Sequence, residues 1–309
     1  MEAKIKLINR YKKEKNAIIL AHNYQPNSIQ KVADYTGNAL TLTQKAIKSS
    51  AEVIVSCGVN CMAESLKVLL PNKTILTPEI FAGCPLSIMV EVKDIIELKE
   101  KHPGAAVVSY INSSAELKAE SDVCCTSDNA LDIVNKIKEN KIIFLPDIHL
   151  ADYVDKRTNK EIISFGGYCP IHHRVSLNDL KRMKKKYPNT KLLVHPTCRE
   201  EIREKADYIG SIEGIIAYAK ESEAQEMIIG TDKGIICRLK EENPEKKFYL
   251  LSRQLNCHNM KRTKLEKIVD SLRYMQTEIT VREDIRVDAR KSLENMFKLL
   301  ETKSTAQVV

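Results

Sequence analysis

The sequence repeats one pattern of apolar runs and polar stops three times. In each repeat, a first, a second and a third apolar run follow one another, and the nine runs lie at 17–21, 53–57, 74–78, 106–109, 123–127, 142–146, 191–194, 208–211 and 227–231. Short apolar runs bounded by turn signals are typical of buried parallel strands. The period of roughly 80–90 residues predicts a triplicated α/β unit, with parallel sheets and helices on both faces.

Helical patterns lie between these runs. We expect helices at 30–49 and 131–140, with Asp128 as a candidate N-cap of the second. From Arg262 onward the chain is charged and amphipathic, and we expect it to pack back on the body, with a disordered end after Lys303. The predicted division is therefore three α/β domains at 1–88, 89–172 and 173–258, followed by a helical segment at 259–309.

The composition narrows the class of protein. The 309 residues contain no apolar run of signal-peptide or membrane-spanning length, so we expect a cytoplasmic protein whose nine cysteines are reduced or bind metal. The net charge of +8 comes with no tryptophan and only five phenylalanines. Since aromatic stacking platforms are scarce, the lysines indicate a solvated surface and small anionic substrates, with neither nucleic acid nor membrane as a partner.

Polar side chains follow the predicted strands. Ligands of open α/β sheets bind outside the carboxyl ends of parallel strands. The residues at these ends are His22, Asn23, Tyr24, Tyr110, Asn112, Ser127, His195 and Ser211. A single histidine after a strand is more often a structural hydrogen-bonding group. Three sets at matching positions favour a shared central site.

Three cysteines occupy similar places in the three repeats. Cys84, Cys169 and Cys257 stand near the ends of successive units, 85 and 88 residues apart by their numbers. Local zinc motifs place their ligands a few residues apart, and disulfide frameworks occur in short secreted chains. If the fold brings the three thiolates together, they form a metal site with one coordination position open.

Motifs from one end of the chain to the other resemble the quinolinate synthase family. They are His22-Asn23-Tyr24-Gln25, Met62-Ala63-Glu64, Gly83-Cys84-Pro85, Tyr110-Ile111-Asn112, Cys125-Thr126-Ser127, Pro146-Asp147, Tyr168-Cys169, His195-Pro196, Gly210-Ser211, Gly230-Thr231 and Asn259-Met260-Lys261. Each motif alone is weakly diagnostic, whereas the full set in this order is specific.

The resemblance implies a fold and an activity. The fold would be three similar three-layer α/β/α domains around a pseudo-threefold axis, with the active site at the centre. Cys84, Cys169 and Cys257 would hold a [4Fe–4S] cluster with one open iron. The reaction would join iminoaspartate to dihydroxyacetone phosphate and form quinolinate for NAD synthesis, with loss of water and phosphate. A monomer or homodimer is expected.

The resemblance also assigns roles to residues. The catalytic positions are His22, Tyr24, His195 and Thr197. The substrate-binding positions are Ala39, Tyr110, Asn112, Ser127, His149, Ser211 and Ile212, with phosphate expected at Ser211. His172 and His173 are expected to surround the cluster and tune it.

Some of these positions depart from the family pattern. The family has Asp-Ser at Asn38-Ala39, Glu at Thr197, Thr at Ile212, Asn at His149, Phe at Cys61 and Glu at Asp232. A threonine at 197 does not take up a proton near neutral pH as a carboxylate does. Ala39 and Ile212 remove hydrogen-bonding groups from the expected anion pocket.

These departures leave three functions open. The first is the standard synthase, and the second is a diverged relative that uses the open iron on another substrate or for sulfur transfer. The third is a non-catalytic binding protein stabilised by zinc. The remaining cysteines, Cys57, Cys124, Cys125, Cys198 and Cys237, are expected to be small buried core residues, and Cys61 is a candidate extra thiol at the cavity.

The cysteine assignment predicts a selective loss of metal. Replacing Cys84, Cys169 or Cys257 by alanine is expected to abolish the cluster, because a three-ligand site cannot lose one ligand. Cys237→Ala is the matched control and should keep full iron and sulfide. Anaerobic purification followed by iron and sulfide analysis measures both, and full retention in any of the three variants contradicts the assignment.

Overall fold

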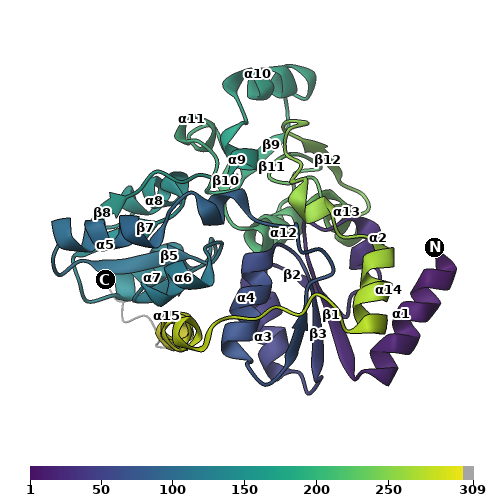
Figure 1. The fold of residues 1–309 in the computed structure, drawn as a ribbon. Coiled ribbons are helices and arrows are strands. Elements are labelled where there is room, and N and C mark those ends of the chain that lie inside the picture. Colours follow the sequence, from purple (N-terminus) through teal and green to yellow (C-terminus); the bar gives the residue numbers. More distant parts are fainter. Residues whose placement is uncertain (302–309) are drawn as a thin grey trace.

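Three parallel sheets of four strands confirm the triplicated α/β architecture. The computed structural model describes residues 1–301. The sheets have the orders β2-β1-β3-β4, β6-β5-β7-β8 and β10-β9-β11-β12, so each unit places its first strand beside its second and third. Figure 1 shows the three units as three groups around a common centre, with the β9–β12 unit at the top. The identical strand order is the structural form of the sequence repeat.

The first unit contains residues up to the first of the three cysteines. Its elements are α1 (Glu2–Glu14), β1 (Ala17–His22), α2 (Asn27–Gln30), β2 (Tyr35–Gly37), α3 (Ala39–Lys48), β3 (Val53–Cys57), α4 (Asn60–Leu69) and β4 (Thr74–Leu76), and the 3₁₀ turn η1 (Pro85–Ile88) follows.

The second unit repeats this alternation. Its elements are α5 (Val92–Lys101), β5 (Ala106–Tyr110), α6 (Ala115–Ala119), β6 (Val123–Cys125), α7 (Ala130–Lys136), β7 (Lys141–Leu145), α8 (Ile148–Asp155) and β8 (Glu161–Ser164).

The third unit and the C-terminal segment complete the described chain. They contain α9 (Pro170–His173), α10 (Leu177–Lys186), β9 (Lys191–Val194), α11 (Glu200–Arg203), β10 (Tyr208–Ile209), α12 (Ile212–Glu221), β11 (Glu226–Gly230), α13 (Ile235–Glu242), β12 (Lys247–Leu250), the turn η2 (Asn259–Lys261), α14 (Leu265–Tyr274) and α15 (Glu283–Glu301). The domain boundaries at 88, 172 and 258 stay predictions.

The strand order predicted for the first unit was wrong by one strand. The prediction missed β2, β8 and β12, and it took 53–57 as a second strand, whereas this segment is the third strand, β3. The predicted helix 30–49 is interrupted by β2, and only Ala39–Lys48 is the helix α3. Asn129, not Asp128, is the N-cap residue of α7, so the cap prediction is also wrong.

An aspartate joins the first two strands of every unit at one fixed spacing. Each carboxylate accepts a hydrogen bond of 2.7 Å from a backbone N–H of the first strand, and each pair is 15 residues apart. The pairs are Asp34 with Ile19, Asp122 with Val107, and Asp207 with Leu192. The backbone N–H of the same aspartate returns a bond to the carbonyl of that residue. The three units therefore place their first and second strands in equivalent register.

The C-terminal helices cover two of the three units. Helix α14 lies beside α1, and its Ile268 and Leu272 are buried in the core of the first unit. Helix α15 packs against α6, β6, α4 and α7, and its Ala289, Leu293 and Met296 are buried in the core of the second unit. Figure 1 shows α15 between these two units. The predicted disordered end after Lys303 lies outside the described residues.

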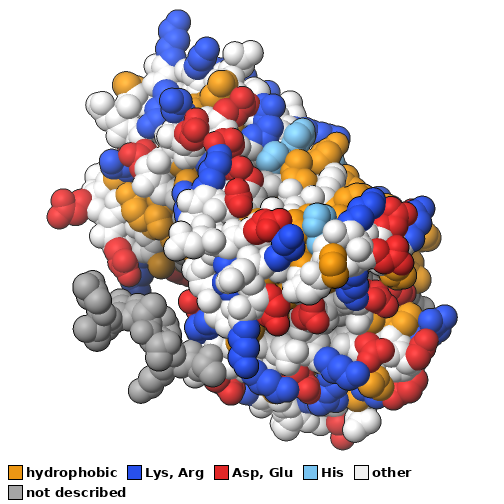
Figure 2. Space-filling model, turned by 90° about the vertical axis from the view of Figure 1, so that its left-hand side faces the viewer, with side chains coloured by type: hydrophobic (Ala, Val, Ile, Leu, Met, Phe, Trp, Pro, Cys, Tyr) orange, Lys and Arg blue, Asp and Glu red, His pale blue; other side chains and the backbone are white. Residues whose placement is uncertain are grey.

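Charges of both signs are mixed over the face shown in Figure 2, with no large patch of one sign. Such mixing is typical of an ordinary solvated surface. Within residues 1–301, helices reach neither the length nor the sustained hydropathy needed to cross a bilayer.

The packing of α15 predicts a large cost for truncating its buried face. Leu293 is 0% exposed, so Leu293→Ala is expected to lower the free energy of unfolding by about 2–5 kcal/mol, the usual cost of a core leucine. Val287→Ala on the same helix, at a side chain 43% exposed, is the control and should change it by at most about 0.5 kcal/mol. Urea unfolding followed by circular dichroism measures both, and equal values would contradict the packing.

Candidate active site

The centre of the three units holds a pocket built from equivalent positions. We call it the central pocket, and its cavity volume is about 70 Å³. Its first set of lining side chains is His22, Tyr110 and His195. Each of them lies three residues after the strand residue whose N–H bonds to the aspartate. The second set is Ala39, Ser127 and Ile212, and each of them lies five residues after the aspartate of its unit. The repeated register therefore delivers two positions from each unit to one cavity.

Most of the predicted site residues meet here. Tyr24, Asn112 and Thr197 also line the central pocket. Ser211 does not line it, and its hydroxyl hydrogen-bonds to Asp128, which does. His149 lies elsewhere, with its Nε2 2.8 Å from His173 Nδ1 and the two rings stacked. The structure thus brings nine of the eleven predicted catalytic and substrate-binding residues to one cavity (the six named above with Tyr24, Asn112 and Thr197).

A chain of hydrogen bonds runs through the wall of the central pocket. Tyr24 bonds to Thr231, and Thr231 lies 2.9 Å from His172 Nε2. The hydroxyl oxygen of Thr197 lies 2.9 Å from His172 Nδ1 and 2.6 Å from His195 Nδ1. His195 Nε2 lies 3.2 Å from Ser127 Oγ. The chain therefore crosses side chains from all three units.

One backbone contact fixes the direction of this chain. The N–H of Thr197 donates to His195 Nδ1 at 3.3 Å, so that nitrogen is an acceptor and the ring proton is on Nε2. The Thr197 hydroxyl then donates to His195 and accepts from the Nδ1–H of His172. His172 Nε2 accepts from Thr231, which in turn accepts from Tyr24. Each donor in this chain therefore has an acceptor while both imidazole rings stay neutral.

Burial keeps these rings neutral. It lowers the pKa of His22 to about 3, with the charge of Lys261 adding to the effect, and it lowers the pKa of His172 to about 3. The pKa of His195 lies well below its ordinary value for the same reason. Burial also raises the pKa of Tyr24 and of Tyr110. In His22 the backbone N–H of Tyr24 donates to Nδ1 at 3.0 Å, which leaves a proton on Nε2.

The three predicted cysteines meet in an adjoining cavity. Cys84, Cys169 and Cys257 line a space of about 340 Å³, which we call the cysteine pocket. Tyr24, Asn112, Cys169, His172 and Met260 line both this cavity and the central pocket. A group bound by the cysteines would therefore stand next to the histidines and tyrosines.

Each cysteine is held by the same local geometry. A short helical turn follows each one, and the backbone N–H three residues on acts to lower the pKa of the thiol. These groups are Ser87 for Cys84, His172 for Cys169 and Met260 for Cys257. Amide groups at the start of a helical turn stabilise a thiolate. Asp147 accepts from the Cys169 N–H at 3.0 Å, and Asp232 accepts from the Cys257 N–H at 2.6 Å.

The chemistry of the three thiols is compatible with an iron–sulfur cluster. Thiolate sulfurs are the usual ligands of such clusters, and here three of them border one cavity. Among residues 1–301, no three His, Cys, Asp or Glu side chains form a group that could hold a metal ion. Burial raises the pKa of Cys169 and Cys257, so metal binding at these thiols releases protons.

Comparison with known proteins agrees with this geometry. A family model described as "Quinolinate synthetase A protein" matches residues 6–298. The chain belongs to this family. It is 48% identical to a quinolinate synthase of Alkaliphilus metalliredigens over 94% of this chain and 97% of that protein. It is 47% identical to quinolinate synthase 1 of Methanosarcina acetivorans, over 95% and 96%, and 48% identical to a quinolinate synthase of Clostridium kluyveri, over 94% and 97%. The resemblance stated from the motifs is confirmed.

The other cysteines of this quinolinate synthetase A family member differ in their surroundings. Cys57, Cys124, Cys125 and Cys198 are buried, as predicted, whereas Cys237 lies half-buried on α13 and the core prediction for it is wrong. The thiol of Cys61, on α4, hydrogen-bonds to Cys84, which lowers the pKa of Cys61 and raises that of Cys84.

Sequence reasoning quoted Thr231 and Lys261 in family motifs and Asp232 as a departure, but it gave these residues and Asp128 no role in the site. Thr231 joins Tyr24 to His172, and Lys261 bonds to both Asp232 and the Tyr24 carbonyl. Asp128 joins Asn38 to Ser211. Thr231 and Asp232 immediately follow β11, so the rule that strand ends carry function would have found them had it been applied to the third strand of each unit.

The hydrogen-bond chain makes Thr197 a sensitive position. Thr197→Val keeps the shape but leaves the Nδ1–H of His172 without its acceptor, so the free energy of unfolding should fall by about 1–3 kcal/mol. Ring ¹⁵N spectra should show a changed tautomer balance at His172, while His195 keeps the backbone N–H of residue 197 as the donor to its Nδ1. Thr190→Val removes another buried threonine hydroxyl, bonded 2.7 Å from the Tyr187 carbonyl, and should leave these spectra unchanged. Unaltered histidine signals in Thr197→Val would refute the chain.

Proposed function

We propose that this protein is a [4Fe–4S]-dependent quinolinate synthase that joins iminoaspartate to dihydroxyacetone phosphate, with loss of water and phosphate. One observation carries the proposal: three cysteines from three units border a cavity that adjoins the pocket of His22, Tyr110 and His195. Family membership and identities of 47–48% over nearly the full length support the same reaction.

The cofactor proposal rests on the donor set and on its neighbours. Cys84, Cys169 and Cys257 would hold the cluster, and with three cysteine ligands for four irons one iron stays open. When bound, the cluster supplies a Lewis-acidic iron for a substrate hydroxyl or carboxylate. The wall shared by the two pockets, with Tyr24, Asn112 and His172, would place the substrate against that iron.

Proton transfer falls to neutral side chains in this proposal. His22 presents an Nε2–H, because its Nδ1 accepts the Tyr24 N–H. Tyr24 can return a proton through Thr231, to which its hydroxyl is bonded. His195 is oriented by Thr197 and presents its Nε2–H toward Ser127. A neutral imidazole that presents an Nε2–H donates a hydrogen bond to a substrate oxygen, and such a bond stabilises the oxygen as it gains negative charge.

Substrate anions would be bound without a formal positive charge. The described residues lining the central pocket include neither lysine nor arginine. Asn112, Ser127 and Tyr110 supply neutral donors, and hydrogen bonds from such groups to a carboxylate are charge-assisted. Ala39 and Ile212 add apolar surface in the same cavity, against which the carbon skeleton of a substrate can pack.

A direct assay tests the function. Anaerobically reconstituted protein, given iminoaspartate and dihydroxyacetone phosphate, is expected to form quinolinate, measured by chromatography, and to contain about four irons per chain. Cys237→Ala should match the unaltered protein, while Cys169→Ala should lose the activity. An iron–sulfur protein that forms no quinolinate would indicate a diverged relative acting on another substrate. A colourless, zinc-loaded protein would refute the cluster as well.

A further inference from the structure

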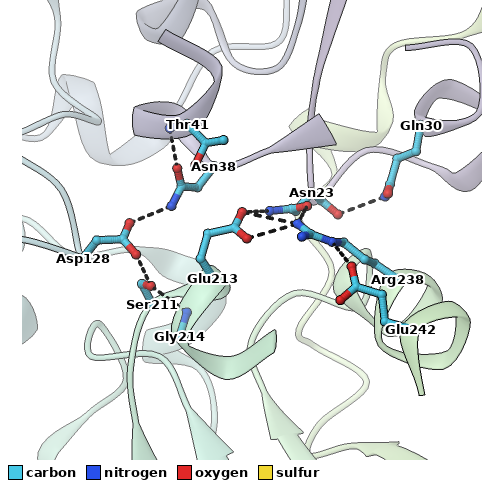
Figure 3. Close-up of polar contacts among 10 residues, drawn as sticks. All are labelled: Asn23, Gln30, Asn38, Thr41, Asp128, Ser211, Glu213, Gly214, Arg238 and Glu242. Atoms are coloured by element: carbon cyan, nitrogen blue, oxygen red, sulfur yellow. Dashed lines mark hydrogen bonds and ion pairs between the residues drawn. The ribbon is translucent and has the colours of Figure 1, made fainter. Parts of the chain in front are cut away.

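One carboxylate joins the loops of all three units at the mouth of the central pocket. Asp128, in the second unit, accepts a hydrogen bond of 2.6 Å from Asn38 Nδ2 of the first unit. Its other oxygen accepts from the hydroxyl of Ser211, in the third unit. Figure 3 shows the Asp128 carboxylate between these two side chains. Asp128 is solvent-exposed as a residue and also lines the pocket, so its carboxylate stands at the entrance.

Both partners of Asp128 are N-cap residues of ten-residue helices. Asn38 accepts the Thr41 N–H at 2.9 Å at the start of α3, and Ser211 accepts the Gly214 N–H at 3.1 Å at the start of α12. The start of a helix favours a negative charge because its free amide groups point outward. The carboxylate thus lies at the converging starts of two helices, where a bound anion is best stabilised.

The side-chain donors of Asn38 and Ser211 both bond to Asp128. The next residue on each helix is apolar, Ala39 on α3 and Ile212 on α12, so on these two helices the cap side chains are the groups that donate to the Asp128 carboxylate. Within residues 1–301, neither lysine nor arginine forms an ion pair with Asp128. The nearby Arg238 is occupied by Glu213, at 3.1 Å, and by Glu242, at 2.7 Å.

A second contact keeps the start of α12 in place independently of Asp128. Asn23, after β1, donates to Glu213 at 2.9 Å and accepts from Arg238 at 3.2 Å (Figure 3). This contact ties the first unit to α12 and α13 without using Asp128. If the carboxylate moved away, the Ser211 hydroxyl would therefore remain where it is.

The central pocket is small for the proposed substrates. A volume of about 70 Å³ is well below the roughly 300–1,000 Å³ of ordinary ligand pockets. Asp128 lines this pocket, so moving its carboxylate away from Asn38 and Ser211 would enlarge it.

We propose that Asp128 is an internal anion that holds the three loops over the central pocket and that the phosphate of the substrate displaces. The proposal rests on the proposed function for the identity of the substrate. Displacement frees Asn38 Nδ2, the Ser211 hydroxyl and the starts of α3 and α12 for the incoming phosphate. Asp128 is thereby a specificity-determining residue, because every anion must compete with it before it binds.

Removing the charge of Asp128 should therefore tighten phosphate binding. In the cluster-containing protein, Asp128→Asn is expected to bind inorganic phosphate about five- to tenfold more tightly, the effect of removing one like charge nearby at the protein surface. The KM for dihydroxyacetone phosphate should fall by a similar factor. Isothermal titration calorimetry and initial rates measure the two.

A matched control separates local from general charge effects. Asp132→Asn makes the same change on α7, at a side chain 54% exposed and paired with Lys136, and should leave phosphate affinity unaltered. If the asparagine variant does not fold, Asp128→Ser removes the charge with a smaller side chain and gives the same readout.

Two outcomes overturn the proposal. Phosphate affinity equal to or weaker than that of the unaltered protein would show that Asp128 does not compete with anions. A raised KM would show instead that Asp128 helps to bind the substrate. The calorimetric test needs no turnover, so absence of quinolinate formation would refute the proposed function while leaving this measurement valid.

Discussion

The site depends on a hydrogen bond between a carboxylate and a strand, made three times. Asp34, Asp122 and Asp207 each lie just before a second strand and bond to the first strand 15 residues earlier. Because a parallel strand exposes one face or the other according to its register, this bond fixes which residue emerges at the carboxyl end. Three identical registers bring His22, Tyr110 and His195 to one point.

Some strands of the fold could be predicted from the sequence and others could not. The apolar runs at 53–57 and 142–146 were predicted as strands and correspond to β3 and β7. The edge strands β2 and β8 are short and partly exposed and carry no run of this length. The edge strand β12 was missed although residues 248–251 are four consecutive apolar residues. The aspartate before each second strand, in Asp34-Tyr35, Asp122-Val123 and Asp207-Tyr208, is a polar signal that would have located β2.

The residues of the site could also be predicted only in part. Histidines and tyrosines at strand ends, and the cysteines, could be read because each depends on local order. Contacts such as Tyr24 with Thr231, 207 residues away, or Asp128 with Ser211, 83 away, depend on how the units are placed in space. No periodicity in the sequence carries that information. His149 shows the converse, since a position assigned by resemblance lies against His173, outside the central pocket.

The hydrogen-bond chain from Tyr24 to Ser127 depends on the contact between the units. Its links come from side chains of three separate units, so no single unit contains a complete path for a proton. If the units separate to admit substrate, the chain loses its two ends, because Tyr24 parts from Thr231 and Ser127 parts from His195. The complete chain therefore forms only where the three units meet. A molecule that contacts one unit alone meets only a part of it.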